Sequence, residues 1–217
     1  TSFVVKPGER VAFVGATGAG TSSIVNLISR FYEFQKGEIL LDGVDIRSIP
    51  VDELRARIGV VLQDVFLFSG SLRENVRLHD SAVTDERIWE AIRAVGAERF
   101  VERLPDGLDH DVRERGVTLS VGQRQLIAFV RAYLSNPHVL ILDEATEGLA
   151  PLIRQAIWDV IARLKQDTGL GILLIDKSLK ELSAIADTAV ILDRGTRVWG
   201  GTIAELTPEV TNRHLGL

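Results

Sequence analysis

The stretch Arg10-Val-Ala-Phe-Val-Gly-Ala-Thr-Gly-Ala-Gly-Thr-Ser-Ser23 carries the strongest fold signal in this sequence. It begins with a short apolar run, Arg10–Val14, which is typical of a buried strand and leads into the glycine-rich turn Gly15–Gly20. An amphipathic helical pattern follows over Thr21–Arg30. Glycines let main-chain N–H groups turn inward, and the start of a helix adds a partial positive charge. The stretch therefore predicts a strand, a phosphate-binding loop and a helix.

This turn fits the phosphate-loop pattern of Gly, four residues, Gly, Lys and then Ser or Thr, except at one position. Thr21 stands where the lysine would reach the β- and γ-phosphates of a nucleotide, while Ser22 remains as a Mg²⁺ ligand. Taken alone, the stretch could also be a generic glycine-rich turn between a strand and a helix. The residues that we expect to bind nucleotide are Gly15, Ala16, Thr17, Gly18, Ala19, Gly20, Thr21, Ser22 and Ser23.

Outward from this loop, strand-like runs alternate with helical stretches, which predicts an α/β fold with a mainly parallel sheet. Further strands are expected at Ile58–Leu62, Val139–Leu142 and Gly171–Ile175. Two hairpins are expected, one around Asp42-Gly43 and one around Arg194-Gly195. The first of them predicts an antiparallel β-subdomain.

The segment between Asp64 and Asn136 differs, because strand signals disappear and helical periodicity covers Arg87–Leu104. We interpret it as an inserted helical subdomain. The α/β pattern then resumes, with a helix opened by Pro151. The sequence thus predicts one domain over residues 1–217, with 1–63 and 137–217 as the α/β core and 64–136 as the helical subdomain.

An acidic pair, Asp143-Glu144, directly follows the apolar run Val139–Leu142. A carboxylate at the C-terminal end of a buried parallel strand lies in the crevice where α/β folds bind ligands. Asp143 would hold Mg²⁺ through water, and Glu144 would orient or deprotonate an attacking water. The alternative interpretation is an ordinary solvated strand end.

Composition limits the classes of function. The chain is 46% hydrophobic and 25% charged, as expected of a protein with a packed core, and it contains no cysteine that could form disulfides or thiolate metal sites. The net charge of -5 argues against a nucleic-acid partner. The apolar runs are too short to cross a bilayer, so any membrane connection is expected through a partner or another piece of chain.

A third motif, Leu119-Ser-Val-Gly-Gln123, precedes an apolar helix. Together with the glycine-rich loop and the acidic pair, at their separations, it resembles the ATP-binding cassette (ABC) family. The resemblance implies a P-loop NTPase (RecA-like) core that takes ATP and Mg²⁺. It also implies that this signature binds the γ-phosphate of a nucleotide held by the opposite subunit, through Ser120, Val121, Gly122 and Gln123. The plainer interpretation is a helix capped by Ser120, and Val121 departs from the commonest form of the motif.

The resemblance also assigns roles to single residues. Gln63 is similar to the Q-loop residue that contacts Mg²⁺ and the attacking water, and Lys177 stands where most cassettes carry the switch histidine. Glu144, Gln63 and Lys177 are thus the expected catalytic set, and Ser22, Gln63 and Asp143 the expected metal set. The aromatic residue that stacks on adenine would lie upstream of Thr1.

The expected partners follow from the same resemblance. Val65–Asn75 and Arg113–Gly116 look like exporter-type cassettes, in which the stretch before the signature touches a transmembrane domain. We therefore expect a homodimer, or a pair with a related ATPase subunit, that is cytoplasmic and peripheral to the membrane through the transporter.

The last third resembles a different branch. Glu147–Pro151, Ile157–Arg163 and Ile175–Leu179 are similar to the ATPases of branched-chain amino-acid importers, and the join falls near Ala145-Thr146. A recombined or engineered chimera is one interpretation, and a divergent natural cassette is the other. Importer-type sequences tolerate both Lys177 and Ala150, which stands at the D-loop aspartate position.

The function expected from sequence is thus the ATP-hydrolysing motor of an ABC transporter with impaired activity. One lost charge-assisted contact at Thr21 is worth roughly 2–4 kcal/mol, or on the order of 10²–10³ in rate. One alternative is a hydrolysis-deficient cassette with a structural or regulatory role. The other is a cassette ATPase acting on DNA or ribosomes, and the net negative charge of the chain argues against this one.

Overall fold

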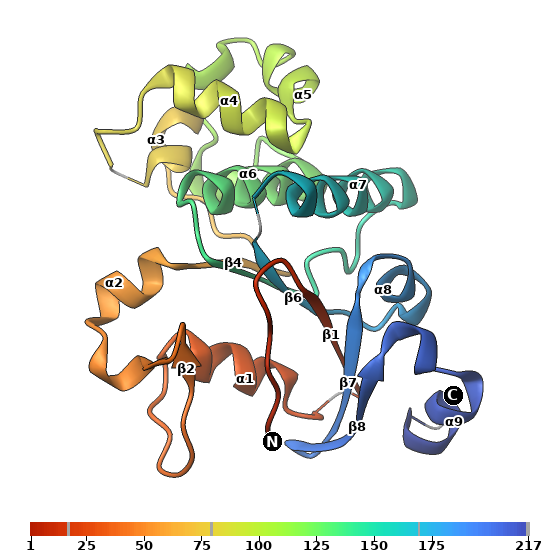
Figure 1. The fold of residues 1–217 in the computed structure, drawn as a ribbon. Coiled ribbons are helices and arrows are strands. Elements are labelled where there is room, and N and C mark those ends of the chain that lie inside the picture. Colours follow the sequence, from red (N-terminus) through yellow and green to blue (C-terminus); the bar gives the residue numbers. More distant parts are fainter. Residues whose placement is uncertain (17, 79, 169, 216–217) are drawn as a thin grey trace. The chain divides into compact units, whose positions relative to one another are not determined.

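The computed structural model describes residues 1–16, 18–78, 80–168 and 170–215. Its described part divides into two compact units (Figure 1). The α/β unit comprises Thr1–Val60, Pro137–Glu144 and Gly169–Leu217, and the helical unit comprises Val61–Asn136 and Ala145–Thr168.

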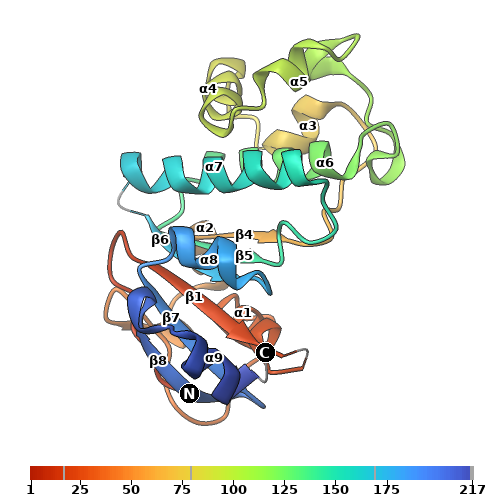
Figure 2. The same ribbon diagram turned by 90° about the vertical axis from the view of Figure 1, so that its right-hand side faces the viewer.

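A six-stranded sheet in the order β4-β5-β6-β1-β7-β8 is the centre of the α/β unit (Figure 2). The strands are β1 (Arg10–Gly15), β4 (Ile58–Leu62), β5 (Val139–Asp143), β6 (Gly171–Ile175), β7 (Thr188–Asp193) and β8 (Thr196–Thr202). β1 pairs in parallel with β6 and β7, β5 pairs in parallel with β6, and only the described pairing of β8 with β7 is antiparallel. β6 is buried at every position, as expected for a parallel strand with both faces covered. The mainly parallel sheet predicted from the sequence is confirmed.

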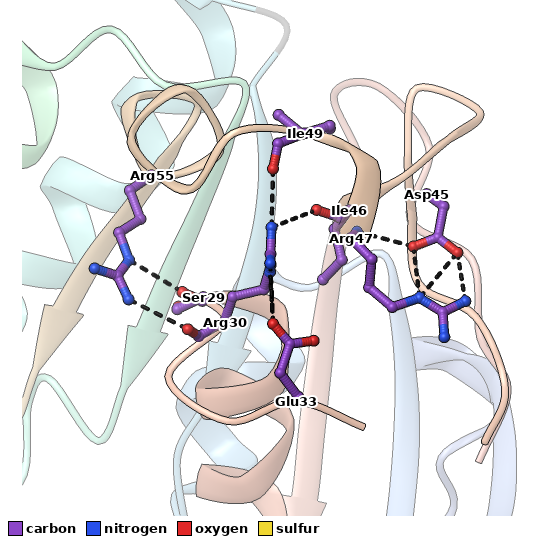
Figure 3. Close-up of polar contacts among 8 residues, drawn as sticks. All are labelled: Ser29, Arg30, Glu33, Asp45, Ile46, Arg47, Ile49 and Arg55. Carbon is purple, nitrogen blue, oxygen red and sulfur yellow. Dashed lines mark hydrogen bonds and ion pairs between the residues drawn. The ribbon is translucent and has the colours of Figure 1, made fainter. Parts of the chain in front are cut away.

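The first helix, α1 (Thr21–Ile28), is held at its C-terminal end by two arginines (Figure 3). Arg30 donates from Nη1 to the carbonyls of Ile46 at 3.1 Å and Ile49 at 2.8 Å. Arg55 donates to the carbonyls of Ser29 and Arg30, each at 3.2 Å. These contacts join α1 to the segment that follows the small hairpin, so the helix after the phosphate loop is anchored at its far end.

The small hairpin consists of the antiparallel strands β2 (Leu40–Leu41) and β3 (Val44–Asp45), and the segment after it contains the short helix η1 (Ile46–Ser48) and α2 (Val51–Ala56). Asp45 caps η1 by accepting from the N–H of Arg47 at 2.9 Å. Hydrogen bonds from the side chain and main chain of Arg47 lower the pKa of Asp45 to about 2. Helices α8 (Leu179–Ile185) and α9 (Pro208–Leu215), with η4 (Ile203–Glu205) between them in the chain, complete the α/β unit.

Five α-helices form the described part of the helical unit. They are α3 (Leu72–Arg77), α4 (Asp85–Val95), α5 (Glu98–Glu102), α6 (Val121–Leu134) and α7 (Pro151–Thr168), with the short helices η2 (Gly107–Asp109) and η3 (Glu114–Gly116) between α5 and α6. α6 contacts α3, α4 and α7, and Figures 1 and 2 show α6 and α7 running side by side. Ser71 and Ser120 begin α3 and α6 with capping boxes, in which the side chain of the cap and that of the third residue bond each other's main chain.

Two helices differ from the sequence prediction. The helix expected over Thr21–Arg30 ends at Ile28, and Arg30 has a φ of 49°, outside the helical region. The helical run expected over Arg87–Leu104 is two helices, because Gly96 at φ 72° ends α4 and Ala97 caps α5. A left-handed glycine after a helix is a common C-terminal cap.

The helix opened by Pro151 forms as expected. The sequence analysis placed all of residues 137–217 in the α/β core. Contacts instead group Ala145–Thr168 with the helical unit, because α7 packs against α4 and α6. The predicted subdomain boundaries at 63 and 136 stay a prediction. Within the described residues, no helix is both long and apolar enough to cross a membrane.

Candidate nucleotide site

The glycine-rich loop leaves β1 through close contacts that exclude side chains. A Cβ on Gly15 would meet the Leu192 carbonyl oxygen at 2.9 Å and the Ala19 Cβ at 2.5 Å. Gly20 has a φ of 99°, and a Cβ there would meet the Cα of Gly195 at 3.2 Å. Gly195 also donates its N–H to the Ala19 carbonyl at 2.7 Å. The loop is therefore braced by the β7–β8 turn, a partner that the sequence analysis did not identify.

The N-terminus of α1 opens directly from this loop. Gly20 is its N-cap and, among the described residues, no side chain caps the helix or places an acidic group in its first turn. Ser22 and Ser23 are exposed, whereas Ala19 is buried. The first-turn N–H groups and these hydroxyls thus form the donor set that an anion needs. Of the expected loop residues, Thr17 lies outside the described ones.

The acidic pair lies at the C-terminal end of β5, with Asp143 as its last residue and Glu144 directly after it, at the same edge of the sheet as the loop. Asp143 pairs with Ile175 on β6, and Ile175 pairs with Phe13 on β1, two residues before Gly15. The strands β5, β6 and β1 are parallel, so their C-terminal ends meet at one edge. Asp143 is half-buried, and burial raises its pKa. A partly desolvated carboxylate is stabilised by a bound cation.

Glu144 has an unusual backbone conformation. Its φ of 49° lies in the left-handed region, which costs a non-glycine residue on the order of 1 kcal/mol or more. Its N–H donates to the Ile175 carbonyl at 2.8 Å, and its carboxylate faces the Lys177 ammonium at 3.4 Å. Lys177 follows β6 in a turn in which Asp176 accepts from the N–H of Ser178 at 2.8 Å. The structure thus brings Glu144 and Lys177 together.

Gln63 and the signature residues belong to the helical unit. The Ser120 hydroxyl accepts from the Gln123 N–H at 3.3 Å, and the Gln123 side chain accepts from the Ser120 N–H at 2.8 Å. The helix cap considered in the sequence analysis is therefore present, and a phosphate would have to share the N–H of Gln123 with it. Val121 is half exposed, so its side chain is not packed into the core of the helical unit.

Gly122 has a packing role that the motif alone did not reveal. It is buried, and a Cβ there would meet the Cγ2 of Ile153 on α7 at 2.5 Å. A glycine at this position therefore permits the close approach of α6 and α7.

Gln125 was missed by the sequence reasoning. Its side chain is buried, and its Nε2 donates to the carbonyls of Leu62 at 2.9 Å and Gln63 at 2.8 Å. The signal available in the sequence was its helical spacing from Gly122 and Phe129, which places a polar residue on the buried face of α6.

A parallel sheet, a glycine-rich loop leading into an uncapped helix and an acidic pair on the same sheet edge define a P-loop nucleotide-binding fold. Comparisons with known proteins agree. A family model described as ABC transporter matches residues 1–147. The chain is 44% identical over 205 residues to the "Probable multidrug resistance ABC transporter ATP-binding/permease protein YheH" of Bacillus subtilis, covering 94% of the chain and 30% of that protein.

Two further relatives support the same assignment. The "Fatty acid ABC transporter ATP-binding/permease protein" of Mycobacterium tuberculosis is 42% identical over 207 residues, which cover 94% of the chain and 32% of that protein. A solved bacterial Atm1-family ABC exporter with ATP bound superposes with a TM-score of 0.86 at 33% identity, over 98% of the chain and 36% of the exporter chain. This chain belongs to the ABC transporter family, as an ATP-binding domain of the P-loop NTPase fold. It spans about a third of the length of these relatives.

Proposed function

We propose that this chain is the ATP-binding and ATP-hydrolysing motor domain of an ABC transporter, working as a head-to-tail pair of cassettes attached to a transmembrane domain. The observation that carries the proposal is the open N-terminus of α1, which follows a loop whose glycines have left-handed φ values of 84° at Gly18 and 99° at Gly20. Main-chain N–H groups and the helix start can hold the phosphates of ATP without a side chain.

Mg²⁺ fits the residues at this site. Among the described residues, no group of three or more His, Cys, Asp or Glu side chains could hold a metal ion, and Mg²⁺ in nucleotide sites commonly takes only one or two protein ligands besides phosphates and water. The exposed Ser22 hydroxyl and the half-buried Asp143 carboxylate supply such ligands, with Gln63 as a third by family resemblance. When bound, Mg²⁺ neutralises charge on the phosphate oxygens.

The proposed hydrolytic roles belong to residues at the ends of β5 and β6. Glu144 orients the attacking water and accepts its proton, and Lys177 places a positive charge beside that carboxylate. Lys177 then supplies a cation toward the γ-phosphate, where Thr21 supplies none. In the opposite orientation of the pair, Ser120, Val121, Gly122 and Gln123 serve the nucleotide of the partner cassette.

An exposed apolar surface on the helical unit supports attachment to a transmembrane domain. Phe66 and Phe68 are 55% and 51% exposed, and their rings form an edge-to-face pair with centroids 5.1 Å apart. Val117, just before the signature, is 71% exposed. Large apolar side chains left together on a surface mark interaction sites. We infer that they contact the transmembrane domain and place the chain at the membrane surface on the cytoplasmic side.

We further propose that the chain hydrolyses ATP slowly, because Thr21 removes a charge-assisted phosphate contact. The test measures Mg²⁺-dependent ATP hydrolysis over a range of protein concentrations for the chain, for Thr21→Lys and for Thr21→Lys with Glu144→Gln. Thr21→Lys should gain on the order of a hundredfold and rise more than linearly with concentration, and Glu144→Gln should remove the gain. A folded but inert Thr21→Lys protein would sink this proposal.

That outcome would favour a second candidate, a cassette with a structural or regulatory role, which Thr21 itself supports.

The importer-like residues after Ala145 support a related proposal, that the chain joins an exporter-type and an importer-type segment. Replacing residues 145–217 by the matching segment of an exporter relative tests it. A mismatch at the join would be relieved by this exchange, so the unfolding midpoint would rise. An unchanged or lower midpoint would contradict the proposal.

A further inference from the structure

One buried amide connects the Q-loop main chain to the signature helix. The Gln125 side chain is on α6, and the residue is 1% exposed. Its Nε2 donates to the carbonyl oxygens of Leu62 at 2.9 Å and Gln63 at 2.8 Å. Only the NH₂ end of an amide can donate to two acceptors, so these carbonyls determine which way the group points.

The other end of this amide indicates that the arrangement is held at a cost. Within the described part of the chain, the buried Oε1 of Gln125 has no hydrogen-bond partner, and a buried acceptor without a partner is unfavourable. We infer that the two hydrogen bonds from Nε2 to Leu62 and Gln63 stabilise this orientation by more than the missing hydrogen bond to Oε1 costs.

The same helix begins at the signature. Ser120 caps α6 five residues before Gln125, and the capping box with Gln123 fixes the first turn. A helix segment of this length moves as a rigid body, because its hydrogen bonds run from turn to turn. The Gln63 side chain is exposed, while its main chain is held through Gln125. A displacement of the Gln63 main chain therefore reaches the start of α6 through two short hydrogen bonds.

We propose that Gln125 is a positioning residue that makes Gln63 and the signature shift together when nucleotide binds. In this role Gln125 acts through the main chain of Leu62 and Gln63. This inference rests on the proposed function, in which Gln63 responds to the chain's own nucleotide and the signature serves the partner's. It deepens that function by naming the residue that couples the chain's own nucleotide site, through Gln63, to the signature that binds the partner's nucleotide.

The test is amide hydrogen exchange of the Thr21→Lys chain with and without MgATP, compared with the same chain carrying Gln125→Met. Methionine keeps the length of the side chain and removes both donors. In the parent, MgATP should slow exchange at the phosphate loop, residues 15–23, and change it at residues 61–65 and 119–124 together. In Gln125→Met, the response at the phosphate loop should remain, and the response at 119–124 should disappear.

Asn75→Leu provides the matched control. Asn75 is also a buried amide of the helical unit that donates to main-chain carbonyls, at 2.8 Å to Phe68 and 3.1 Å to Ser71. It is not bonded to Leu62 or Gln63 in the described structure, so Asn75→Leu should lower stability and retain the coupled response. Gln125→Asn, one methylene shorter, is the second variant in case Gln125→Met does not fold, and the same loss at 119–124 is expected of it.

Kinetics give an independent readout. In the Thr21→Lys background, Gln125→Met should lower kcat about tenfold, because the signature no longer responds to nucleotide. KM should change less than about twofold, because the phosphate loop of the variant is intact. A signature response that survives in Gln125→Met overturns the inference alone. A parent that shows no response at the phosphate loop overturns the proposed function and this inference with it.

Discussion

The ammonium nitrogen of Lys177 lies 3.4 Å from the carboxylate oxygens of Glu144. The two residues follow neighbouring strands, β5 and β6, and the N–H of Glu144 also donates to Ile175 at the end of β6. Of the two side chains, Lys177 is 52% exposed and Glu144 is 26% exposed. An exposed ion pair of this kind contributes little to stability, so its interest lies in where it places a positive charge.

Removing that charge should matter most while Thr21 is present. Lys177→Gln in the chain as it stands should weaken ATP binding about tenfold or more, since a charge-assisted hydrogen bond is worth about 1.5–3 kcal/mol. In the Thr21→Lys background the same change should cost less, because the loop then carries its own cation. Titration of a fluorescent ATP analogue measures the loss of affinity in both backgrounds. Lys180→Gln, an exposed lysine on α8, is the control, and equal losses for both lysines would contradict the assignment.

Asp143→Asn should stabilise the protein while removing metal-dependent activity. Burial raises the pKa of Asp143 above its ordinary value of 3.8, so the folded state holds this proton more tightly than the unfolded state does. Its contribution to the free energy of unfolding is therefore present below pH 3.8 and is lost as pH rises through the raised pKa. Above that pKa the variant should have the higher unfolding midpoint, and the difference should vanish in acid.

Thermal unfolding as a function of pH checks this prediction. Asp193→Asn, at the exposed end of β7, is the matched control and should shift the midpoint little. MgATP should raise the midpoint of the parent and fail to do so in Asp143→Asn. A variant less stable than the parent at neutral pH would show that the carboxylate is stabilised by contacts rather than strained by burial.

Gly122→Ala should destabilise the helical unit through packing. The added methyl group meets the Cγ2 of Ile153 at 2.5 Å, and overpacking of this kind costs about 1–3 kcal/mol. Chemical denaturation measures the loss. Ile153→Ala in the same chain removes the opposing atoms, so the double variant should be more stable than the sum of the two single changes predicts. Strict additivity would mean that α7 does not press on Gly122.

Arg131→Lys should lower the free energy of unfolding by about 2 kcal/mol. Arg131 donates from Nε and Nη2 to Asn75 at 2.6 and 2.9 Å and from Nη1 to the Phe66 carbonyl at 2.8 Å. Burial lowers its pKa to about 10, so the guanidinium is still charged at neutral pH. A lysine carries its three donors on a single nitrogen and does not reproduce the planar fork that reaches these acceptors from three nitrogens. Urea unfolding checks the value, and exposed Arg87→Lys is the control, with a change within about 0.5 kcal/mol.

Local patterns were enough to predict much of the fold. The strands at Ile58–Leu62 and Gly171–Ile175 form with the predicted bounds, because unbroken apolar runs bounded by turn residues suit buried parallel strands. The phosphate loop and its helix were predictable for a similar reason, since glycines and a following amphipathic pattern act over a few residues. The break at Gly96 was missed, because the apolar spacing of Arg87–Leu104 continues across it.

The sequence by itself determined the strand-loop-helix around Gly15–Gly20, the acidic pair at the end of β5 and the Ser120 cap of α6. Each depends on neighbours within a few positions. The tertiary structure alone decided that Gln125 bonds Leu62 and Gln63 and that Gly122 faces Ile153. It also decided that Lys177 meets Glu144, 33 positions earlier in the chain. Partners so far apart are chosen by strand order and helix packing, and no spacing within one segment encodes them.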